Sequence, residues 1–512
     1  MNQFGARFNP AHALDLAALS HPDRISIHYG SGFLTVKQAA LRTQQLATLL
    51  TELGVGVNDI VVLVARNSPY HMLLHVACAR IGAIFAPVSY RFPTPELAAL
   101  FDFIAPVVVV ADPETARSFT GRLPENAFII DDDEFAPLTT QDAPKWRRLQ
   151  ESYADAPAST APVTPAQPDD GGALLFTSGS TGRPKGVRLT HEQLWWGSQN
   201  FREGFEYSNH DVELVTVPLS HIGGFNGTTL DLFSHGGCIV IIREFDPQLV
   251  LQALERHRVA IMFAVPTIYA ALLAHRSFAE FDLRHLRLPL IGGAVCPPAL
   301  LTRMEEQGLA PLNVWGMTEA AAAGFMLSPD LLPQARGAIG IPFAHVQGRI
   351  VDSDGQDADF GELLIAGPNV VDQYWHDADY SSQAFRDGWL YTGDLARRDE
   401  NGFVWIMGRV RYQINTGGEK VIPEEVTNVL VQMPQIADAS VVGIPDPVWG
   451  EIVAAAVIAT PGHESPSVEQ IRDFVAAHIA RYKAPRRIAV VENLPTNANG
   501  KVDIAAVKDL FA

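Results

Sequence analysis

The amino-acid sequence predicts an α/β protein with more than one domain. Short apolar runs rich in β-branched residues recur along the chain, as is typical of buried parallel strands. The clearest of these runs are residues 61–65, 107–111, 239–243 and 261–265. Stretches with a helical pattern separate the runs, and this alternation indicates a layered α/β fold. Because 512 residues exceed what one hydrophobic core usually organises, we expect at least two domains.

Composition and charge exclude several classes of protein. The net charge of −19 argues against a general nucleic-acid-binding protein, which normally presents a basic face. No apolar run approaches the roughly 18 residues of a membrane span, and charged residues interrupt the segment where a signal peptide would lie. The three cysteines are widely spaced and form no CxxC pair: Cys78, Cys238 and Cys296. We therefore expect a cytoplasmic protein whose cysteines are buried and reduced.

A glycine-rich loop is the first candidate site. The segment "TSGSTGRPKG", residues 177–186, follows the apolar run "ALLF" and combines three glycines and four hydroxyl residues with Lys185. Glycines let backbone N–H groups approach a ligand, and successive N–H groups form an anion-binding concavity. The pattern predicts a phosphate-binding loop, with an ordinary turn as the alternative. It is not the P-loop motif, because Gly186 rather than Ser or Thr follows Lys185.

The surroundings of this loop predict where it lies in the fold. The Pro-, Ala-, Ser- and Thr-rich stretch 155–172 predicts a linker or exposed loop. Thr190 and Gln193 have the spacing of a capping box, so we expect a helix to start there. The glycine-rich loop then lies between a strand and a strand–helix unit, a usual ligand position in α/β sheets. Near the C-terminus, "NANGK" predicts an exposed turn that presents Lys501.

Five motifs, taken in order, resemble those of the adenylate-forming superfamily. They are "TSGSTGRPKG", "VWGMTEAA" (314–321), "YTGDL" (391–395), "GRVRYQINTGGEKVIPEEV" (408–426) and "PTNANGK" (495–501). The superfamily contains acyl- and aryl-CoA synthetases, the adenylation domains of nonribosomal peptide synthetases and firefly luciferase. The resemblance extends over essentially the whole chain.

The resemblance implies a fold, a reaction and its cofactors. It implies a large N-terminal domain of several α/β subdomains, residues 1–408, and a small mobile α+β C-terminal domain, residues 409–512, with the site in the cleft between them. The family joins a carboxylate to the α-phosphate of ATP with release of pyrophosphate. It then transfers the acyl group to a thiol, usually that of CoA. The expected cofactors are ATP, Mg²⁺ and either CoA or a phosphopantetheinyl carrier protein.

Residues for ATP follow from the matching motif positions. The loop residues that would grip the β- and γ-phosphates are Thr177, Ser178, Gly179, Ser180, Thr181, Gly182 and Lys185. Glu319 resembles the Mg²⁺-coordinating carboxylate, and Thr318 resembles the hydroxyl beside the α-phosphate. Asp394 resembles the carboxylate that binds both ribose hydroxyls, and Arg409 a second ribose contact. The remaining expected nucleotide contacts are Gly293, Ala294, Trp315, Gly316 and Met317, with Trp315 stacking on adenine.

The C-terminal motifs imply residues for both half-reactions. Lys501 resembles the lysine that bridges carboxylate and α-phosphate during adenylation. Gly417 and Gly418 resemble the loop that lets a pantetheine arm pass close to the backbone, and they equally suit a turn between two strands. At the hinge, where the family usually has Asp or Lys and then Asp, this chain has Arg411 and Tyr412. Arg411 keeps a positive charge, as a lysine would. Tyr412 is a bulky aromatic residue that can pack in only one of the two orientations of the C-terminal domain.

The motifs point to a reaction but not to one particular acid. The residues expected at the acid pocket are His221, Phe225, Asn226, Gly293 and Met317, with His221 alternatively a core histidine. The alanines at 320–323 either leave room for the acid or pack tightly. No acidic residue precedes Asp231 where amino-acid-activating members anchor an ammonium, so we expect an acid without an α-amino group. Aryl and medium-chain aliphatic acids both remain open.

The acyl acceptor has three alternatives. An acid–thiol ligase that uses CoA is the leading hypothesis. A separate carrier protein or a nitrogen nucleophile is the alternative acceptor, and basic residues at 481–487 suit either CoA or an acidic carrier. A non-catalytic nucleotide-binding relative is disfavoured by the complete set of expected catalytic residues.

Overall fold

The computed structural model describes residues 8–138, 146–158, 171–177, 185–496 and 502–512. The chain divides into two compact units. The first comprises Met1–Gly348 with Ile365–Leu390, and the second comprises Arg349–Leu364 with Tyr391–Ala512. The second unit therefore contains residues 391–408, which the expected division at 408 assigns to the N-terminal domain.

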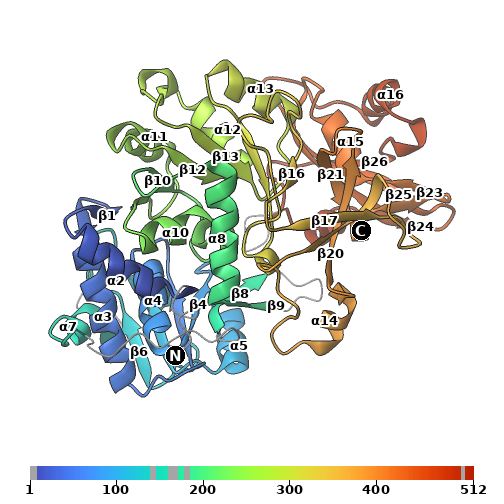
Figure 1. Ribbon diagram of the computed structural model, residues 1–512. Helices are drawn as coiled ribbons and strands as arrows, with labels where there is room; N and C mark the ends of the chain where they lie inside the picture. The colour runs from blue at the N-terminus through green and yellow to red at the C-terminus, as the bar shows by residue number, and fades with distance from the viewer. Residues whose placement is uncertain (1–7, 139–145, 159–170, 178–184, 497–501) are drawn as a thin grey trace. The chain divides into compact units, whose positions relative to one another are not determined.

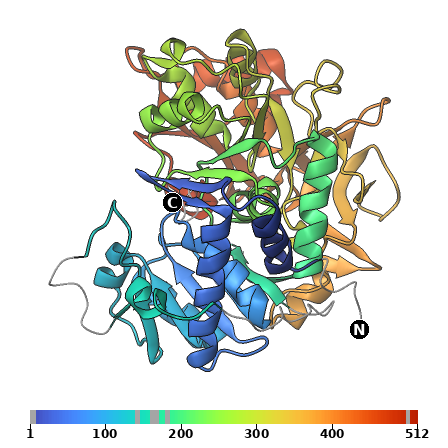
Figure 2. The same cartoon turned by 60° about the vertical axis from the view of Figure 1, so that its left-hand side comes forward.

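One sheet of the first unit holds both ends of the glycine-rich loop in its last two strands. Its strand order is β7-β6-β5-β3-β4-β8-β9, and β8 and β9 are antiparallel while the other pairs are parallel. The strands are β3 (Ile60–Val64), β4 (Ile84–Val88), β5 (Val108–Ala111), β6 (Asn126–Ile129), β7 (Arg147–Arg148), β8 (Gly171–Thr177) and β9 (Lys185–Thr190). The helices that accompany them are α2 (Pro10–Ser20), α3 (Val36–Glu52), α4 (Tyr70–Ile81), α5 (Thr94–Ile104), α6 (Pro113–Ser118), α7 (Leu149–Tyr153) and α8 (His191–Phe205). Helices α2, α3 and α4 lie side by side (Figures 1 and 2).

A second sheet of the first unit has the order β16-β15-β14-β13-β12-β10-β11-β1-β2. Its central pairs, from β11 to β14, are parallel. The strands are β1 (Ile25–Tyr29), β2 (Gly32–Thr35), β10 (Val212–Val215), β11 (Cys238–Ile241), β12 (Ile261–Ala264), β13 (Leu288–Gly292), β14 (Leu312–Trp315), β15 (Phe325–Met326) and β16 (Ile341–Pro342). The helices are α9 (Ile222–Phe225), α10 (Thr228–Ser234), α11 (Pro247–Arg256), α12 (Pro266–Ala274), α13 (Pro298–Glu306) and α14 (Ala378–Ala384).

The second unit contains most of one sheet and all of another, and in the latter the strand at residues 487–490 runs parallel to its neighbour. The first has the order β17-β18-β20-β19 with β21 on β20, and the other has the order β23-β22-β25-β24 with β26 on β25. The strands are β17 (Gln347–Val351), β18 (Phe360–Ala366), β19 (Phe385–Arg386), β20 (Trp389–Arg398), β21 (Val404–Arg409), β22 (Ile414–Thr416), β23 (Glu419–Val421), β24 (Ile436–Asp446), β25 (Gly450–Ala459) and β26 (Arg487–Val490). The helices are α15 (Pro423–Leu430), α16 (Val468–His478) and α17 (Ile504–Asp509).

The structure confirms most of the predicted elements and corrects one. The four predicted strands correspond to β3, β5, β11 and β12. Thr190 accepts a hydrogen bond from the Gln193 N–H, and the Gln193 side chain accepts one from the Thr190 N–H, so the capping box starts α8 as predicted. The predicted linker 155–172 is too long at its end, because Gly171 and Gly172 are buried residues of β8. A Cβ at Gly172 would come within 2.9 Å of His191 Nδ1, so its glycine serves close packing rather than flexibility.

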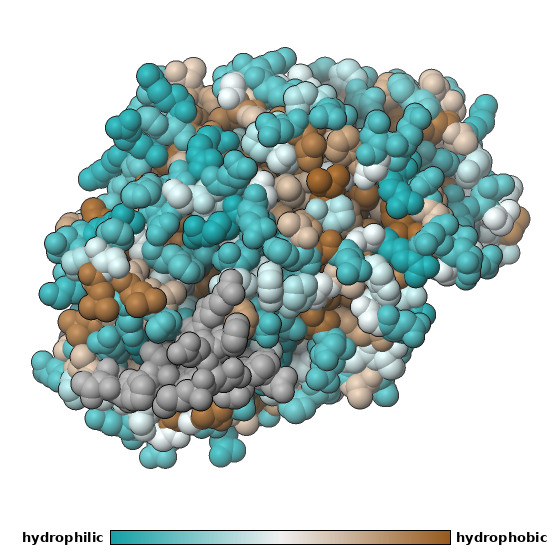
Figure 3. All heavy atoms as spheres, viewed as in Figure 1, coloured by the Kyte–Doolittle hydropathy of each residue, from teal (hydrophilic) through white to brown (hydrophobic). Residues whose placement is uncertain are grey.

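The surface and the cysteines agree broadly with the composition. On the face shown in Figure 3 hydrophilic side chains predominate, and apolar side chains form small groups between them. All three cysteines are free thiols, but only Cys78 is buried, while Cys238 and Cys296 are half-buried. Across the described residues, no helix has both the length and the apolar character that crossing a membrane requires.

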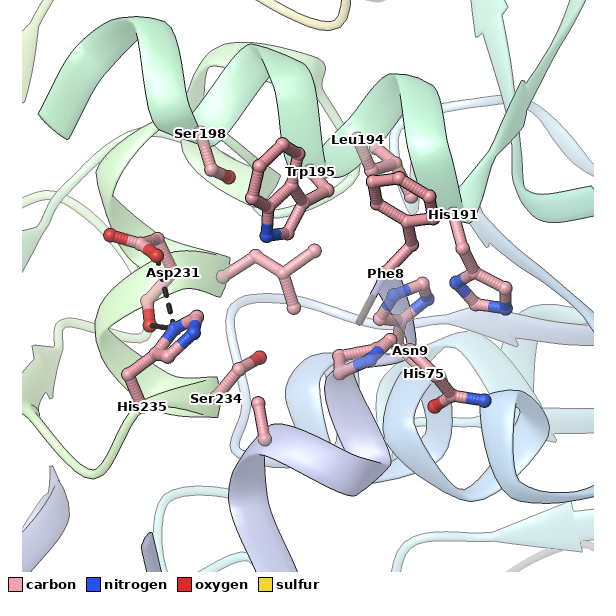
Figure 4. Close-up of a pocket in the computed structure, with 13 residues that line it drawn as sticks. Phe8, Asn9, His75, His191, Leu194, Trp195, Ser198, Asp231, Ser234 and His235 are labelled. Atoms are coloured by element: carbon pink, nitrogen blue, oxygen red, sulfur yellow. Dashed lines mark hydrogen bonds and ion pairs between the residues drawn. The ribbon is translucent and has the colours of Figure 1, made fainter. Parts of the chain in front are cut away.

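A small pocket lies beside α8. It has a volume of about 30 Å³, enough for about two water molecules, and it lies between α8, α10, α4 and the start of α2 (Figure 4). His75 and His191 line it, and neither ring nitrogen of either residue has a hydrogen-bond partner among the described residues. Burial holds the pKa of His191 at about 4, and burial together with the neighbouring His191 holds the pKa of His75 well below its ordinary value. Both imidazoles are therefore neutral near pH 7.

These histidines predict a loss of stability in mild acid. The ordinary pKa of a histidine is 6.5, so below this pH the histidines of the unfolded chain take up protons. In the folded protein, His191 takes up its proton only near pH 4. The free energy of unfolding should therefore fall by up to about 1.4 kcal/mol per pH unit for each of the two histidines over this window. Chemical denaturation of wild type and of the double variant His75→Leu, His191→Leu between pH 7 and 4.5 measures the slope. Equal slopes in the two proteins would contradict the assignment.

Candidate functional site

Two antiparallel strands hold the ends of the glycine-rich loop. Thr177 ends β8 and Lys185 begins β9, and the two residues are directly paired. The predicted loop residues Ser178, Gly179, Ser180, Thr181 and Gly182 lie outside the described residues, as does Lys501. The predicted position of the loop, between a strand and a strand–helix unit, is confirmed because β9 leads directly into α8.

Lys185 rests against two tyrosines. Its Nζ lies 2.8 Å from the ring centroid of Tyr380 and 5.5 Å from that of Tyr374. Over the described ranges, the ammonium makes no ion pair with a carboxylate. A cation over an aromatic face is stabilised by the ring quadrupole, by roughly 0.5–2 kcal/mol. Lys185 is thus held by interactions weak enough for a phosphate to replace.

Glu319 is a buried carboxylate with a fixed orientation. It lies in a short 3-10 turn, Thr318–Ala320, that follows β14, and 6% of its surface is exposed. The Tyr374 phenol donates a hydrogen bond of 2.7 Å to its Oε1. Its other oxygen, Oε2, accepts no hydrogen bond from the part of the chain that the structure describes. An ionised carboxylate this buried requires a positive partner or additional donors.

The segment 369–375 braces this turn from one side. Asn369 donates to the carbonyls of Ala320 at 2.7 Å and Ala323 at 2.8 Å. The Val371 N–H donates to the Glu319 carbonyl, and the Trp375 N–H donates to the Gly186 carbonyl, each at 2.8 Å. The same short segment therefore ties the glutamate turn to the strand that begins with Lys185.

Asn226 holds the alanine run that belongs to this turn. The alanines at 320–323 are buried, so they pack tightly rather than leave open room. Ala321 and Ala322 have φ angles of 49° and 77°, a left-handed conformation that an alanine adopts only when its surroundings hold it. Asn226, expected at the acid pocket, is 1% exposed and donates to the Ala321 carbonyl at 2.9 Å. Phe225, expected there too, is fully buried against the rings of Phe85 and His75.

The other predicted residues of the first unit lie where the parallel strands end. Gly293 and Ala294 follow β13 and are exposed, while Trp315, Gly316 and Met317 follow one another from the end of β14. His221 is half-buried and directly precedes α9. The carboxyl ends of parallel strands are where open α/β sheets bind ligands.

Phe263 forms an apolar wall at these strand ends. A Cβ at Gly223 would meet its Cε1 at 2.8 Å and one at Gly292 would meet its Cε2 at 2.9 Å, so each of two glycines lies close to one edge of the ring. The side chain is half-buried, and Val265 stands two residues further along. The sequence analysis did not select Phe263, and nothing but its place at the end of an apolar run could have indicated it.

Asp394 and Arg409 form one pair in the second unit. They are directly opposite each other on β20 and β21, and Arg409 Nε lies 2.7 Å from Asp394 Oδ1. Arg409 also donates to the Thr392 carbonyl at 3.0 Å. The structure thus brings together two residues that the sequence predicted for one ribose. Arg409 is partly exposed and Asp394 is buried, so the pair leaves the guanidinium open to solvent on one side.

Glu424 is a neighbour of this pair that the sequence analysis missed. Burial raises the pKa of its carboxyl, Asp394 raises it further and Arg409 lowers it. Its Oε2 is buried without a hydrogen-bond partner in the described ranges, and a Cβ at Gly408 would overlap it. Glycine at 408 is therefore required for the close approach of this carboxyl to β21.

The expected thiol loop is a tight hairpin. Gly417 and Gly418 connect β22 to β23 with φ angles of 62° and 88°, which suits the two-residue turn of a β-hairpin. The Gly417 N–H donates to the Trp449 carbonyl at 2.9 Å, and the Arg486 guanidinium lies 4.2 Å from the Trp449 ring centroid. Among the expected hinge residues, Arg411 donates to the Tyr412 hydroxyl at 2.7 Å.

The two arrangements suit a nucleotide-dependent ligase. One combines a cation next to a glycine-rich loop with an oriented carboxylate, and the other pairs an aspartate with an arginine. Comparison with known proteins agrees: the family model of the AMP-binding enzyme matches residues 14–375, and that of the AMP-binding enzyme C-terminal domain matches residues 425–501. The chain belongs to the AMP-binding enzyme family. It is an AMP-forming acid–thiol ligase, which activates a carboxylic acid as an acyl-adenylate.

The similar proteins cover nearly the whole chain. Feruloyl-CoA synthase of Amycolatopsis sp. is 33% identical over 494 residues, with 96% of each chain covered. Indoleacetate–CoA ligase of Aromatoleum aromaticum is 31% identical over 507 residues, with 98% of this chain and 97% of that one covered. Among solved structures, the o-succinylbenzoate CoA synthetase MenE of Bacillus subtilis in complex with its acyl-adenylate matches with a TM-score of 0.83 at 26% identity, covering 97% and 98% of the two chains. The expected α/β architecture, with a large N-terminal and a smaller C-terminal part, is confirmed.

The glutamate turn should tolerate no side chain at Gly316. A Cβ there would overlap the Ala322 carbonyl, so Gly316→Ala should lower the free energy of unfolding by about 1–3 kcal/mol and displace the turn that carries Glu319. Denaturant unfolding and ATP-dependent pyrophosphate release measure the two effects. In the control Gly32→Ala, the new Cβ meets nothing closer than 3.7 Å, and stability should stay within about 0.5 kcal/mol of wild type. If the two variants were equally stable and active, the close packing of the turn would be refuted.

Proposed function

We propose that this protein converts an aryl-substituted carboxylic acid into its CoA thioester, using Mg²⁺-ATP. The observation that carries the choice of acid is the apolar wall of Phe263, whose ring lies close to Gly223 and Gly292 at the carboxyl ends of β12 and β13. A planar ring stacks favourably on such a wall, and aromatic pairs contribute about 0.5–1.5 kcal/mol beyond the area they bury. The names of the similar ligases, feruloyl-CoA synthase and indoleacetate–CoA ligase, support the same class of acid.

The absence of an α-amino group from the substrate has structural support. Asp231 is the acidic residue that follows the expected pocket segment, but its carboxylate is buried and already paired. Arg202 lies 2.7 Å from Oδ2, Tyr207 donates to the same oxygen at 2.7 Å, and His235 lies 3.0 Å from Oδ1. An ammonium group would have to displace the guanidinium of Arg202. We therefore assign Asp231 to the structure and not to the substrate.

The first unit supplies the groups for the phosphates. Lys185 would leave the tyrosine rings to contact the β- and γ-phosphates, and the Thr318 hydroxyl would lie on the side of the α-phosphate. Glu319 fits a divalent cation, because its carboxylate is oriented through Oε1 and accepts no hydrogen bond at Oε2 among the described residues. When bound, Mg²⁺ would neutralise phosphate charge and so favour attack by the carboxylate.

The second unit supplies the ribose contacts and the residues for each half-reaction. The Asp394 carboxylate would accept hydrogen bonds from both ribose hydroxyls, and its ion pair with Arg409 would keep the carboxylate oriented. We propose that Lys501 stabilises the charge that develops on the α-phosphate and carboxylate during adenylation. In keeping with the family, residues 409–512 would then reorient at Arg411 and Tyr412. The hairpin of Gly417 and Gly418 would take over for thiol attack.

CoA is the acceptor that the surface of the second unit favours. Trp449 is 42% exposed, lies against Gly417 and carries the Arg486 guanidinium over its ring. An exposed aromatic ring next to a guanidinium suits an adenine ring and a phosphate, the two ends of the CoA nucleotide. A phosphopantetheinyl carrier keeps one phosphate, as a diester, but has no adenine ring, so we place the carrier and a nitrogen nucleophile as alternative acceptors.

A panel of acids tests the proposed function. Pyrophosphate release with Mg²⁺-ATP is measured for aryl, fatty and amino acids, each with and without CoA, and the products are identified by mass spectrometry. We expect release with aryl acids, acceleration by CoA and formation of an aryl-CoA. In Phe263→Ala the KM for the aryl acid should rise about 3- to 10-fold, the equivalent of one aromatic contact, while the KM for ATP stays unchanged.

Three outcomes would overturn parts of this proposal. Release with fatty acids alone would refute the aryl class. Release that CoA leaves unchanged, with transfer to a carrier or an amine, would refute CoA as the acceptor. No acid-dependent release across the panel would refute catalysis altogether.

The two half-reactions should separate by mutation. Lys501→Ala should slow adenylation by ~10²–10³-fold and leave thioester formation from supplied acyl-adenylate intact. Gly417→Ala should do the reverse, with thioester formation slowed by ~10²-fold, because its Cβ would meet the Trp449 ring at 2.5 Å on a backbone with φ of 62°. Single-turnover measurements of each half-reaction compare the variants. Equal losses in both half-reactions for either variant would refute the division of labour.

A further inference from the structure

We propose that Tyr374 is a positioning residue that keeps Lys185 and Glu319 apart, so that the lysine stays available to phosphate and the glutamate to the metal ion. This inference rests on the proposed roles of Lys185 and Glu319. The phenol of Tyr374 donates to the Glu319 carboxylate at 2.7 Å, and its ring centroid lies 5.5 Å from the Lys185 ammonium. One side chain thus touches the anion through its hydroxyl and faces the cation with its ring.

The separation of the two charges requires an explanation. Lys185 and Glu319 are opposite charges that share a neighbour, and no ion pair within 4.0 Å forms between them in the described structure. In a site shielded from water, such charges attract strongly. A direct pair would satisfy both groups, and both would then have to be released before Mg²⁺-ATP could bind.

Three further contacts fix Tyr374 in its place. Its ring packs against Tyr380 at a centroid distance of 5.0 Å and against Phe385 at 5.4 Å. Its N–H donates to the Ser381 hydroxyl at 2.9 Å. The phenol therefore meets Glu319 from a rigid support, and Tyr380 offers Lys185 a ring face at 2.8 Å as the alternative to the carboxylate.

Removal of the Tyr374 hydroxyl should let the two charges collapse onto each other. In Tyr374→Phe the ring remains and the charge-assisted hydrogen bond to Glu319 is lost. The dissociation constant for Mg²⁺-ATP should rise about 10- to 100-fold, and the Mg²⁺ concentration for half-maximal binding should rise with it. Calorimetry without any acid measures both quantities, so the result does not depend on turnover or on the identity of the substrate.

Chemical labelling of Lys185 reports the collapse directly. An ion pair stabilises the ammonium form, so acetylation of Lys185 in the nucleotide-free protein should be slower in Tyr374→Phe than in wild type. The rate should recover in the double variant Tyr374→Phe, Glu319→Gln, because the carboxylate is then gone. Peptide mass spectrometry follows the reaction at this one residue.

Tyr70→Phe is the matched control. Tyr70 is also buried, and its phenol also donates to a carboxylate, that of Asp132 at 2.9 Å. Tyr70→Phe should lower stability without changing the affinity for Mg²⁺-ATP or the labelling of Lys185. An equal loss of affinity in both variants would reduce Tyr374 to a structural residue and overturn the proposal.

Two other results would also overturn it. One is unchanged Mg²⁺-ATP affinity in a folded Tyr374→Phe protein. The other is faster labelling of Lys185 in the single variant Glu319→Gln than in wild type, which would show that Lys185 and Glu319 already pair in the wild-type protein. This single variant tests the proposal even if Tyr374→Phe fails to fold. Failure of the proposed function is seen separately, in the acid panel.

Discussion

The hydrogen bond from the Tyr374 phenol to the Glu319 carboxylate is the interaction on which the arrangement of the first unit depends. It joins a segment after residue 365 to the turn after β14, and the same segment is bonded to the Gly186 carbonyl on β9. Among the described residues, no other donor reaches Oε1 of this carboxylate, which is 6% exposed. Because the bond is charge-assisted, it orients the carboxylate as well as satisfying it.

The fold explains why the other groups gather near this turn. Parallel strands β10, β12, β13 and β14 end at one edge of their sheet, where Trp315 is the last residue of β14 and Gly293 and Thr318 lie in the segments that follow β13 and β14. Ala321 and Ala322 take left-handed φ angles, and carbonyls of this run accept hydrogen bonds from the side chains of Asn226 and Asn369. A strained turn held by buried amides gives a fixed position to Glu319.

Sequence reasoning succeeded where local pattern decides the structure. The strands β3, β5, β11 and β12 and the capping box of α8 follow from apolar runs and from a four-residue signature. The pairing of Asp394 with Arg409 was not itself predicted, but both residues were assigned to one ribose, and a β-hairpin brings them opposite each other. The family motifs thus selected two residues, Asp394 and Arg409, that the structure places in contact.

Contacts between distant segments could not be read from pattern. Tyr374 lies 55 residues from Glu319 and belongs to no motif that the sequence analysis used. Asn226 was expected at the acid pocket, yet it is buried and donates a hydrogen bond to the Ala321 carbonyl. Both its burial and this bond depend on tertiary structure, which local sequence does not show. Gly171 and Gly172 looked like linker, since nothing local shows that His191 and Leu194 pack against one of them.

The most direct test of this account is a crystal structure of the protein with Mg²⁺ and a non-hydrolysable ATP analogue. The account predicts that Lys185 Nζ leaves the Tyr380 ring for a terminal phosphate, that the metal ion binds Glu319, and that the hydrogen bond from Tyr374 to Glu319 persists. A bound nucleotide with Lys185 still on Tyr380, or with the metal ion remote from Glu319, would contradict it.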